Sequence, residues 1–439
     1  MKKTIFITSC HPLISRNILS TGILQKLNSN NIQIVIIVPD GKIDYFENNF
    51  GDKDILIRSV KLKLTLRESF LRYLSLAALN TKTLNIKRST EMDGSGKYFK
   101  YIASNYFFIK LIRKVELLSY RKYIFSELFD EFKPFLIFST DIQNDIDVAL
   151  MVESRKKGLR TIGMVRSWDN LTSKGLIRCI PHKILVWNNI IKEEAIKYHL
   201  INASTVSIIG IPHYDKYSKN DSFDKKSFFE KIGGDISQKI LLYIPIGDRY
   251  LKWNNVDRDM VDILNKALPL DFQILVRLPP GDYVRGLEDK PNQFERINVR
   301  YDRVSKSHEN IKQTEIKYDE DSHLNQTLFF SDIVVSGPST MILDSIFMNK
   351  PVIIFGFDGY ENKGYYDSVR RFYDYDNFKP VIESGGVKYA QNHDELIKYL
   401  MLYINDKNSN FKQRQELKKL EATFTDSLST ERLLNSLIN

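Results

Sequence analysis

Residues 336–340 combine the residue types from which proteins commonly build a phosphate site. In order, they are Ser336, Gly337, Pro338, Ser339 and Thr340. They follow a short apolar run and precede a helical pattern, which predicts a strand-to-helix turn. Glycine there lets the backbone approach a ligand closely, proline fixes the turn, and the N-terminus of a helix attracts anions. The alternative is that the two hydroxyl residues at the end of the turn only cap the helix.

Asp169 is the candidate for a general base. It follows a predicted buried strand at 161–165, and parallel sheets bind their ligands at the carboxyl ends of the strands. Transfer of a group to an acceptor hydroxyl needs such a base, which typically contributes about 10²–10⁴-fold in rate. Trp168 could raise the pKa of the carboxyl by excluding water, or could stack on a sugar ring. Two alternatives stay open: Asp169 and Asn170 form a turn that caps the next helix, or His11, which also follows a predicted strand, is the base.

Three basic residues lie where they could neutralise a phosphate group. Arg277 ends a predicted strand at 272–278, and a guanidinium group matches a phosphate through two parallel hydrogen bonds. Arg166 and Lys174 flank Asp169 and could bind a phosphate of the donor or the acceptor. Arg277 could equally pair with a neighbouring carboxylate.

The sequence predicts no metal site. Its seven histidines show neither HxxxH nor HxH spacing. Two pairs of acids, Asp145 with Asp147 and Asp374 with Asp376, match an Asp-x-Asp pattern, but we interpret both as surface acids. We therefore expect no cofactor, with a helix dipole and basic side chains stabilising the leaving phosphate in place of a metal ion.

An alternation of strand and helix patterns must position these residues. In the first half of the chain, strands are predicted at 3–9, 32–38, 134–139, 161–165 and 183–186. In the second half, they are predicted at 239–244, 272–278, 333–335 and 352–355. Helical patterns separate most of these strands, which is typical of parallel sheets. The predicted fold class is α/β, with two Rossmann-like domains facing each other across a ligand cleft and C-terminal helices packing back.

The length of the chain predicts two domains, because 439 residues are too many for one ordinary hydrophobic core. A polar, lysine-rich stretch near the middle is the candidate linker. The predicted parts are a domain at 1–214 with a basic helical insertion at 51–130, a linker at 215–238, and a second domain with terminal helices at 239–439. The resemblance described below implies that the first is the acceptor domain and the second the nucleotide-sugar-binding domain.

Positive charge is concentrated in one segment. The formal net charge is +10, and residues 51–125 hold 16 Lys or Arg against 6 Asp or Glu, so the rest of the chain is neutral overall. The segment is also rich in aromatic residues, and this combination suits an anionic membrane surface. The alternative is a solvated basic face over an ordinary aromatic core. No nucleic-acid-binding motif accompanies the charge, so nucleic acid is not an expected partner.

The sequence contains no recognisable targeting segment. The N-terminus has two lysines and then only a five-residue apolar run, too short for a signal peptide. No stretch approaches the roughly 18–20 apolar residues of a transmembrane helix. Cys10 and Cys179 show no metal or redox spacing, so reduced thiols are expected. We expect a cytoplasmic protein, with contact to the inner face of the cytoplasmic membrane left open.

Three blocks of sequence together resemble GT-B glycosyltransferases, and among them the CDP-glycerol glycerophosphotransferase group of cell-wall polymer enzymes. Residues 166–175 stand where that group carries Trp-His-Gly-Thr-Pro-Leu-Lys-Lys after a strand. Residues 209–215 are similar to its Gly-x-Pro-Arg-x-Asp segment. Residues 336–351 resemble its Ser-Ser…Asp…Lys-Pro segment, which binds donor phosphate. The resemblance covers roughly residues 130–360.

The resemblance implies roles for individual residues. It implies a donor phosphate at the 336–340 turn and an acid, Asp344, near the ribose hydroxyls of the donor; the alternative for Asp344 is an ordinary surface acid. The chain departs from the group at two positions, with Asp169 in place of the presumed base, a histidine, and His213 in place of an arginine. Many inverting members of the broader fold use a carboxylate base, so these departures favour a sugar donor over CDP-glycerol.

We therefore expect a nucleotide-sugar-dependent glycosyltransferase of bacterial surface-glycan synthesis, with inversion implied by the resemblance alone. Its partners would be a nucleotide-sugar donor and a polysaccharide or lipid-linked acceptor. The residues expected to contact the acceptor or a phosphate are Arg166, Trp168, Lys174 and His213. The alternatives are an inactive, membrane-associated scaffold with this fold, and a sugar-nucleotide 2-epimerase. The chain lacks the Gly-Thr-Arg-Pro-Glu and His-Glu-Ala-Gly segments of such epimerases.

Overall fold

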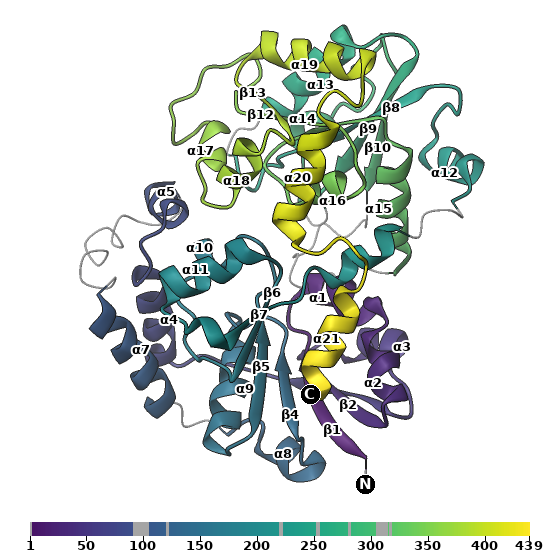
Figure 1. Ribbon diagram of the computed structural model, residues 1–439. Coiled ribbons are helices and arrows are strands. Elements are labelled where there is room, and N and C mark those ends of the chain that lie inside the picture. The colour runs from purple at the N-terminus through teal and green to yellow at the C-terminus, as the bar shows by residue number, and fades with distance from the viewer. Residues whose placement is uncertain are drawn as a thin grey trace. The chain divides into compact units, whose positions relative to one another are not determined.

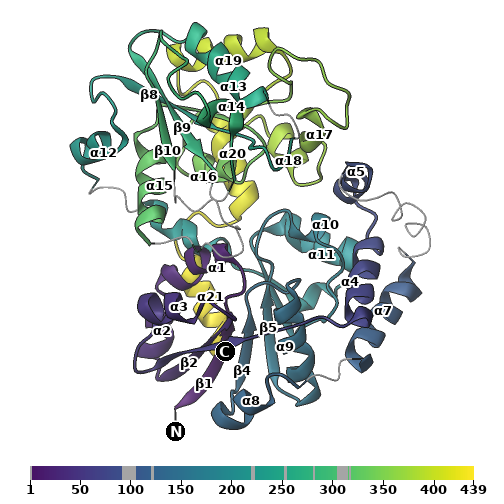
Figure 2. The same cartoon turned by 180° about the vertical axis from the view of Figure 1, so that it is seen from behind.

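The chain folds into two compact units, shown from opposite sides in Figures 1 and 2. The computed structural model describes residues 2–90, 105–119, 123–218, 223–251, 255–279, 282–303, 315 and 318–439. Unit 1 comprises Met1–Asp215 and Ala422–Asn439, and unit 2 comprises Lys216–Glu421. Each unit is built around one parallel sheet.

The sheet of unit 1 has seven parallel strands among the described residues, in the order β3-β2-β1-β4-β5-β6-β7. The strands are β1 (Lys3–Thr8), β2 (Ile32–Pro39), β3 (Ile55–Val60), β4 (Leu136–Ser139), β5 (Arg160–Met164), β6 (Lys183–Val186) and β7 (Val206–Ile208). The order reverses between β1 and β4, as in doubly wound Rossmann sheets, and ligands bind such sheets at that point. The edge strand β3 was not predicted, because Arg58 and Ser59 interrupt its apolar pattern.

Helices connect the strands of unit 1. They are α1 (Pro12–Asn17), η1 (Leu19–Thr21), α2 (Ile23–Ser29), α3 (Ile43–Phe50), α4 (Leu66–Ala77), α5 (Lys82–Thr90), α7 (Tyr106–Ser119), α8 (Ser126–Phe132), α9 (Asp145–Lys156), α10 (Asn170–Ser173), α11 (Asn189–His199), η2 (Ala203–Thr205), η3 (Pro212–Ser218) and α21 (Ser429–Ile438). A single helix is expected after β1, but Gly22, with φ of 84°, separates α2 from the turns before it. Glycine adopts such a backbone conformation at little cost.

Unit 2 has a six-stranded parallel sheet among the described residues, in the order β10-β9-β8-β11-β12-β13. Its strands are β8 (Lys239–Ile244), β9 (Phe272–Leu278), β10 (Val299–Arg303), β11 (Ile333–Ser336), β12 (Val352–Phe355) and β13 (Lys388–Ala390). Its helices are α12 (Lys225–Ile232), α13 (Val256–Ala267), α14 (Arg285–Glu288), α15 (Tyr318–Phe330), α16 (Met341–Phe347), α17 (Arg370–Tyr373), α18 (Phe378–Glu383), α19 (His393–Asn405) and α20 (Phe411–Ala422). As in unit 1, the strand order reverses next to the first strand of the unit, here between β8 and β11. The carboxyl ends of these two strands are therefore a second potential ligand site.

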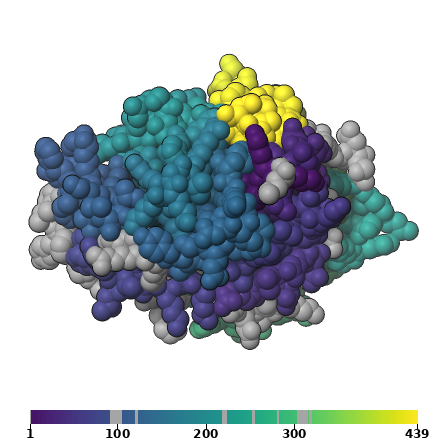
Figure 3. Space-filling view, turned by 90° about the horizontal axis from the view of Figure 1, so that it is seen from below, coloured from purple at the N-terminus to yellow at the C-terminus, as the bar shows by residue number. Residues whose placement is uncertain are grey.

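Two predicted boundaries differ from the structure. The expected linker at 215–238 contains α12, whose Phe228 and Phe229 are buried, with Phe228 stacked on Phe330 at 4.9 Å. The last helix, α21, belongs to unit 1 and not to the C-terminal domain. Its first N–H groups donate to the carboxylate of Asp215 at 3.1 and 2.7 Å, and Figure 3 shows the C-terminal segment beside the N-terminal one.

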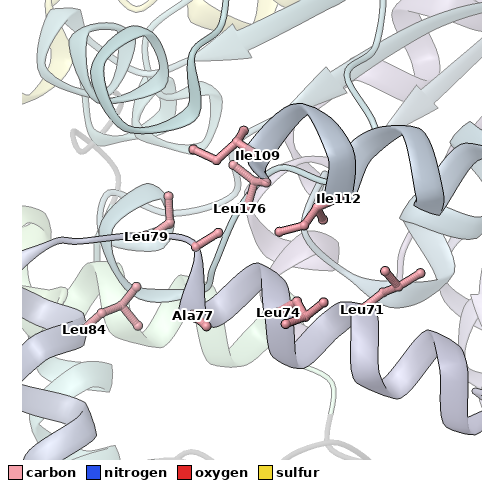
Figure 4. Packing of buried hydrophobic residues seen from close by; sticks show 9 residues of the cluster. Leu71, Leu74, Ala77, Leu79, Leu84, Ile109, Ile112 and Leu176 are labelled. Atoms are coloured by element: carbon pink, nitrogen blue, oxygen red, sulfur yellow. The ribbon is translucent and has the colours of Figure 1, made fainter. Parts of the chain in front are cut away.

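The described part of the basic segment is anchored to unit 1 by an apolar cluster. Helices α4, α5 and α7 contribute Leu71, Leu74, Leu84, Ile109 and Ile112, which pack with Leu176 and their neighbours (Figure 4). The remainder of the segment, including part of its aromatic residues, lies outside the described residues. No helix in the described part of the chain is long and apolar enough to span a membrane.

Candidate active site

A buried carboxyl group lies at the carboxyl ends of the central strands of unit 1. Asp147 of α9 has no exposed surface, and its Oδ1 accepts hydrogen bonds from the hydroxyls of Thr8 (2.5 Å) and Ser139 (2.8 Å). Burial, followed by the negative charge of Asp141, raises the pKa of Asp147 to about 7. The interpretation of Asp145 and Asp147 as surface acids is therefore wrong, because Asp147 is enclosed and Asp145 is held in ion pairs.

We expect Asp147 to make the stability of the protein depend on pH. Its pKa is raised from about 3.8 to about 7, so between these values the folded protein holds a proton that the unfolded chain has released. The stability that this group contributes is therefore fully present below about pH 4 and is lost as the pH rises to about 7.

Asp147→Asn keeps an acceptor oxygen for both hydroxyls but removes the titration. The measurement is the free energy of unfolding of the wild type minus that of Asp147→Asn, by denaturant titration from pH 4 to pH 8. This difference should fall as the pH rises. A difference that is constant across the range would show that the carboxyl does not titrate in this window.

A buried ion pair lies beside this carboxyl group. Arg166 follows β5, and its Nε donates to Oδ2 of Asp141 at 2.7 Å. His11 lies near this pair, and burial, followed by the positive charge of Arg166, lowers the pKa of His11 to about 3. Nδ1 of His11 accepts the N–H of Leu13 at 3.2 Å and caps α1. Because the ring is neutral and Nδ1 is occupied, His11 is suited to donate a hydrogen bond through Nε2 and is a poor candidate for the base.

Asp169 keeps part of its carboxylate available. It is half-buried and precedes α10, and its Oδ2 accepts the hydroxyl of Ser173 at 3.1 Å. Its side chain makes no capping bond to the backbone of α10, so the alternative of a capping aspartate does not fit. Among the described residues, no side chain or backbone group donates to Oδ1 of Asp169. Trp168 beside it is buried, and Lys174 is exposed.

Arg166 and His213, which belong to separate blocks of sequence, line one small cavity in unit 1. Its wall also includes Thr140 and Trp187, which follow β4 and β6. Nε2 of His213 lies 3.3 Å from Nη2 of Arg16. The free volume of about 10 Å³ is close to what one water molecule needs, and a sugar ring does not fit without movement of the lining side chains. Trp187 was not predicted as a site residue, although its position directly after the predicted strand at 183–186 could have indicated it.

In unit 2, the turn at 336–340 joins β11 to α16. A Cβ atom on Gly337 would lie 2.5 Å from the side chain of Ile246, so a larger residue requires a shift of the chain. Oγ of Ser339 accepts the N–H of Met341 at 3.2 Å and thereby caps the helix. Thr340 is exposed, and neither its hydroxyl nor the N–H groups of Ser339 and Thr340 has a partner among the described residues. These three donors are available to an anion.

Two other residues expected at the donor site are buried. Ser336 is fully buried, and its hydroxyl donates to the carbonyl of Gly337 at 2.7 Å. Asp344 is 1% exposed, and its Oδ1 accepts the hydroxyl of Tyr217 at 2.5 Å. The alternative of a surface acid is thus wrong for Asp344, and a ribose contact would require Tyr217 to move away. Pro338 is half-buried at the turn.

Arg277 pairs with a carboxylate, which is the alternative left open from the sequence. It ends β9, is 3% exposed, and forms an ion pair with Asp302 at the end of β10. Nε2 of His323 lies 3.0 Å from the other oxygen of the same carboxylate. Although burial opposes the shift, His323 and Arg277 hold the pKa of Asp302 below its usual value. The charge of Arg277 is thus compensated within unit 2, and its contact with a donor phosphate stays a prediction.

Asp257 organises the loop after β8, although it was not predicted as a site residue. Its carboxylate accepts the N–H groups of Ile246 (2.9 Å) and Gly247 (3.0 Å) and the hydroxyl of Tyr243 (2.6 Å). Gly247 has a φ of 84°, and a Cβ there would lie 2.2 Å from Oδ2 of Asp282, so only glycine fits. An acid in the first turn of a predicted helix is common, so its sequence position could not reveal this role.

The second acidic pair is only partly exposed. Asp374 and Asp376 are half-buried, and Asp374 accepts the hydroxyl of Tyr365 at 2.8 Å. Within the described ranges, no three side chains of His, Cys, Asp or Glu are grouped as a metal-binding site.

Comparisons with known proteins connect these two sites to a fold and a family. A search of curated proteins finds no match. Among solved structures, the chain is similar to a putative UDP-N-acetylglucosamine 2-epimerase from Listeria monocytogenes (12% identity, 99% of this chain, 96% of that chain, TM-score 0.58). It is also similar to a glycosyltransferase from Rickettsia africae (12% identity, 100% of this chain, 99% of that chain, TM-score 0.53) and to the wall teichoic acid polymerase TagF (11% identity, 99% of this chain, 88% of that chain, TM-score 0.53).

At these identities the likeness shows the fold alone, and it confirms the predicted α/β class with two Rossmann-like domains of GT-B type. By sequence, residues 160–439 match the family model described as CDP-Glycerol:Poly(glycerophosphate) glycerophosphotransferase.

Proposed function

Because the chain belongs to the CDP-glycerol:poly(glycerophosphate) glycerophosphotransferase family, we propose that it transfers a sugar from a nucleotide-activated donor to a hydroxyl of a surface-polymer acceptor. The prediction of a nucleotide-dependent transferase is confirmed by this membership. The observation that supports the donor site is the group of three available donors at the 336–340 turn, at the end of a central strand. Such a helix start favours a phosphate oxygen through its N–H groups and its dipole.

In the proposed reaction, the carboxylate of Asp169 takes the proton of the acceptor hydroxyl as that oxygen attacks the anomeric carbon, with inversion. The donor phosphate leaves with its charge stabilised by the 336–340 turn, without a metal ion. The buried ring of Trp168 would exclude water on one side of Asp169. Arg166 and His213 would help to bind an acceptor phosphate if their cavity widens on binding.

A second candidate reaction is favoured by the family match itself, namely transfer of glycerol phosphate from CDP-glycerol. There the acceptor oxygen attacks phosphorus and the product is CMP, whereas glycosyl transfer from a nucleoside-diphosphate sugar releases a nucleoside diphosphate. Identification of the released nucleotide by chromatography therefore separates the two. An epimerase, by contrast, would convert a UDP-sugar without any acceptor.

We expect one nucleotide of the set CMP, CDP, UDP, GDP and dTDP to stabilise the purified protein. At 100 times its dissociation constant, the gain is about 2.7 kcal/mol. Thr340→Val combined with Ser339→Ala should reduce this gain, because the variant loses a free hydroxyl and loosens the turn. Ser345→Ala is the matched control, since the hydroxyl of Ser345 is already bonded to the carbonyl of Met341 in the same helix. The absence of stabilisation by every nucleotide would oppose the transferase proposal.

We also propose that the acceptor is presented at an anionic membrane surface. Apolar side chains are exposed at helical spacing on two helices of the basic segment, with Leu66 and Phe70 on α4 and Phe107 and Leu111 on α7. Exposed apolar residues among lysines are typical of helices that lie in a membrane interface. Binding to vesicles is tested together with the next inference.

A further inference from the structure

A recess in unit 1 lies apart from both strand-end sites and is lined by three arginines. Arg113 comes from α7, Arg155 from α9, and Arg178 from the segment before β6. The remaining wall consists of Leu117, Val152, Cys179 and Ile180. The free volume is about 50 Å³, several times the roughly 10–15 Å³ that one water molecule needs. It is therefore large enough for a group bigger than water, and none of its described lining residues is a carboxylate.

Among the described residues, carboxylates neutralise one of the three arginines. Nη1 of Arg178 lies 3.3 Å from Glu116, and its Nη2 lies 2.5 Å from Asp145. Arg113 donates only to backbone carbonyls, at 3.0 and 2.5 Å, and Arg155 makes one long bond of 3.5 Å to a carbonyl. Within the described residues, neither Arg113 nor Arg155 forms an ion pair with a carboxylate.

The recess is also partly removed from water. Burial lowers the pKa of Arg113 to about 10. Burial likewise raises the pKa of Cys179 to about 12, so this thiol stays neutral and supplies no negative charge. For Arg113, a desolvated guanidinium without a counter-charge among the described residues is unfavourable, and an anion that enters the recess removes this cost. Arg155 is exposed and supplies a positive charge that solvent already reaches.

The surface beside the recess indicates where such an anion comes from. Leu118 follows the lining residue Leu117 on α7 and is 66% exposed. Phe107 and Leu111 lie on the same exposed face of that helix, together with Lys110 and Lys114. An apolar face with lysines matches an anionic bilayer, which carries phosphate groups at the depth where such helices lie.

We propose that the recess of Arg113, Arg155 and Arg178 binds the phosphate of a phosphodiester, supplied by the headgroup of an anionic phospholipid while the exposed face of α7 contacts the bilayer. Arg155 makes only one long bond among the described residues, so its guanidinium can present two parallel N–H groups to phosphate oxygens, which a lysine cannot do. Arg113 adds a second positive charge. The inference rests on the proposed membrane contact and adds to it a defined headgroup site.

The test is co-sedimentation of the full chain with phosphatidylcholine vesicles that contain about 30 mol% phosphatidylglycerol. Vesicles of pure phosphatidylcholine are the neutral reference. We expect Arg155→Gln to lower the partition coefficient about fivefold, which corresponds to about 1 kcal/mol. Arg155→Lys should lower the partition coefficient nearly as much, because lysine keeps the charge but cannot donate two parallel hydrogen bonds to a phosphate group. Lys239→Gln is the control for the loss of one positive charge outside the recess, because Lys239 is exposed at the start of β8 in unit 2.

The outcomes separate the headgroup site from the membrane contact. If Arg155→Lys binds like the wild type while Arg155→Gln binds weakly, charge alone is responsible and the recess is not a site. If all variants bind alike, the membrane contact holds and the recess proposal fails. If the wild type does not bind anionic vesicles, thermal stabilisation by glycerophosphoglycerol, the soluble phosphodiester of that headgroup, is measured instead. Stabilisation that Arg155→Gln abolishes assigns the recess to a soluble phosphodiester, and the absence of stabilisation overturns the proposal.

Discussion

Replacing Asp169 by asparagine is expected to lower turnover by about 10²–10⁴-fold while nucleotide binding stays intact. The substitution keeps the size of the side chain and its bond from Ser173, but it removes the group that accepts the proton. The donor turn lies in unit 2 and does not involve Asp169. The measurement is release of nucleotide in the presence of acceptor, together with thermal stabilisation by whichever nucleotide of the tested set stabilises the wild type.

Two comparisons make this result specific. Ser173→Ala removes one hydrogen bond and leaves the carboxylate in place, so its turnover should fall far less, by less than about tenfold. If Asp169→Asn keeps turnover close to that of the wild type, the base lies elsewhere and this assignment is wrong. If the wild type binds a nucleotide but turns over no donor with any acceptor, the inactive scaffold becomes the better account.

Arg166→Met is expected to destabilise the protein by about 3–5 kcal/mol. The substitution leaves the carboxylate of Asp141 buried without its partner, since both side chains are about 5% exposed and lie 2.7 Å apart. An unpaired charge in such a site costs more than the loss of the attraction alone. The measurement is the midpoint of chemical denaturation at neutral pH.

The double variant Asp141→Leu/Arg166→Met should recover much of this loss, because apolar groups of similar volume need no counter-charge. Lys239→Met provides the exposed comparison, since Lys239 and Asp271 are both about half exposed at 2.9 Å. Its cost should stay below about 1 kcal/mol. A double variant as unstable as Arg166→Met would show that packing at this site, and not charge, is what Arg166 supplies.

The parallel sheets could be predicted because their strands are buried on both faces and therefore appear as continuous apolar runs. The strands at the sheet edges were harder to find. β3 carries Arg58 and Ser59, and β10 reads Val-Arg-Tyr-Asp-Arg, so neither has the pattern of a central strand. The polar composition of the segment before β8 predicts a linker. In the structure this segment contains α12, which is packed on unit 2 through the buried Phe228 and Phe229.

The α/β class, the two-unit organisation and the turn at 336–340 could be predicted from the residues alone, because they depend on local periodicity and on glycine and proline placement. The tertiary structure decided which charged groups are available. It pairs Arg277 with Asp302 and encloses Asp147 and Asp344. Among the described residues it gives Arg113 and Arg155 backbone carbonyls and no carboxylate as partners. Such pairings join residues of different strands and helices, and the free energy of a charge depends on its burial and on its neighbours, which no local pattern encodes.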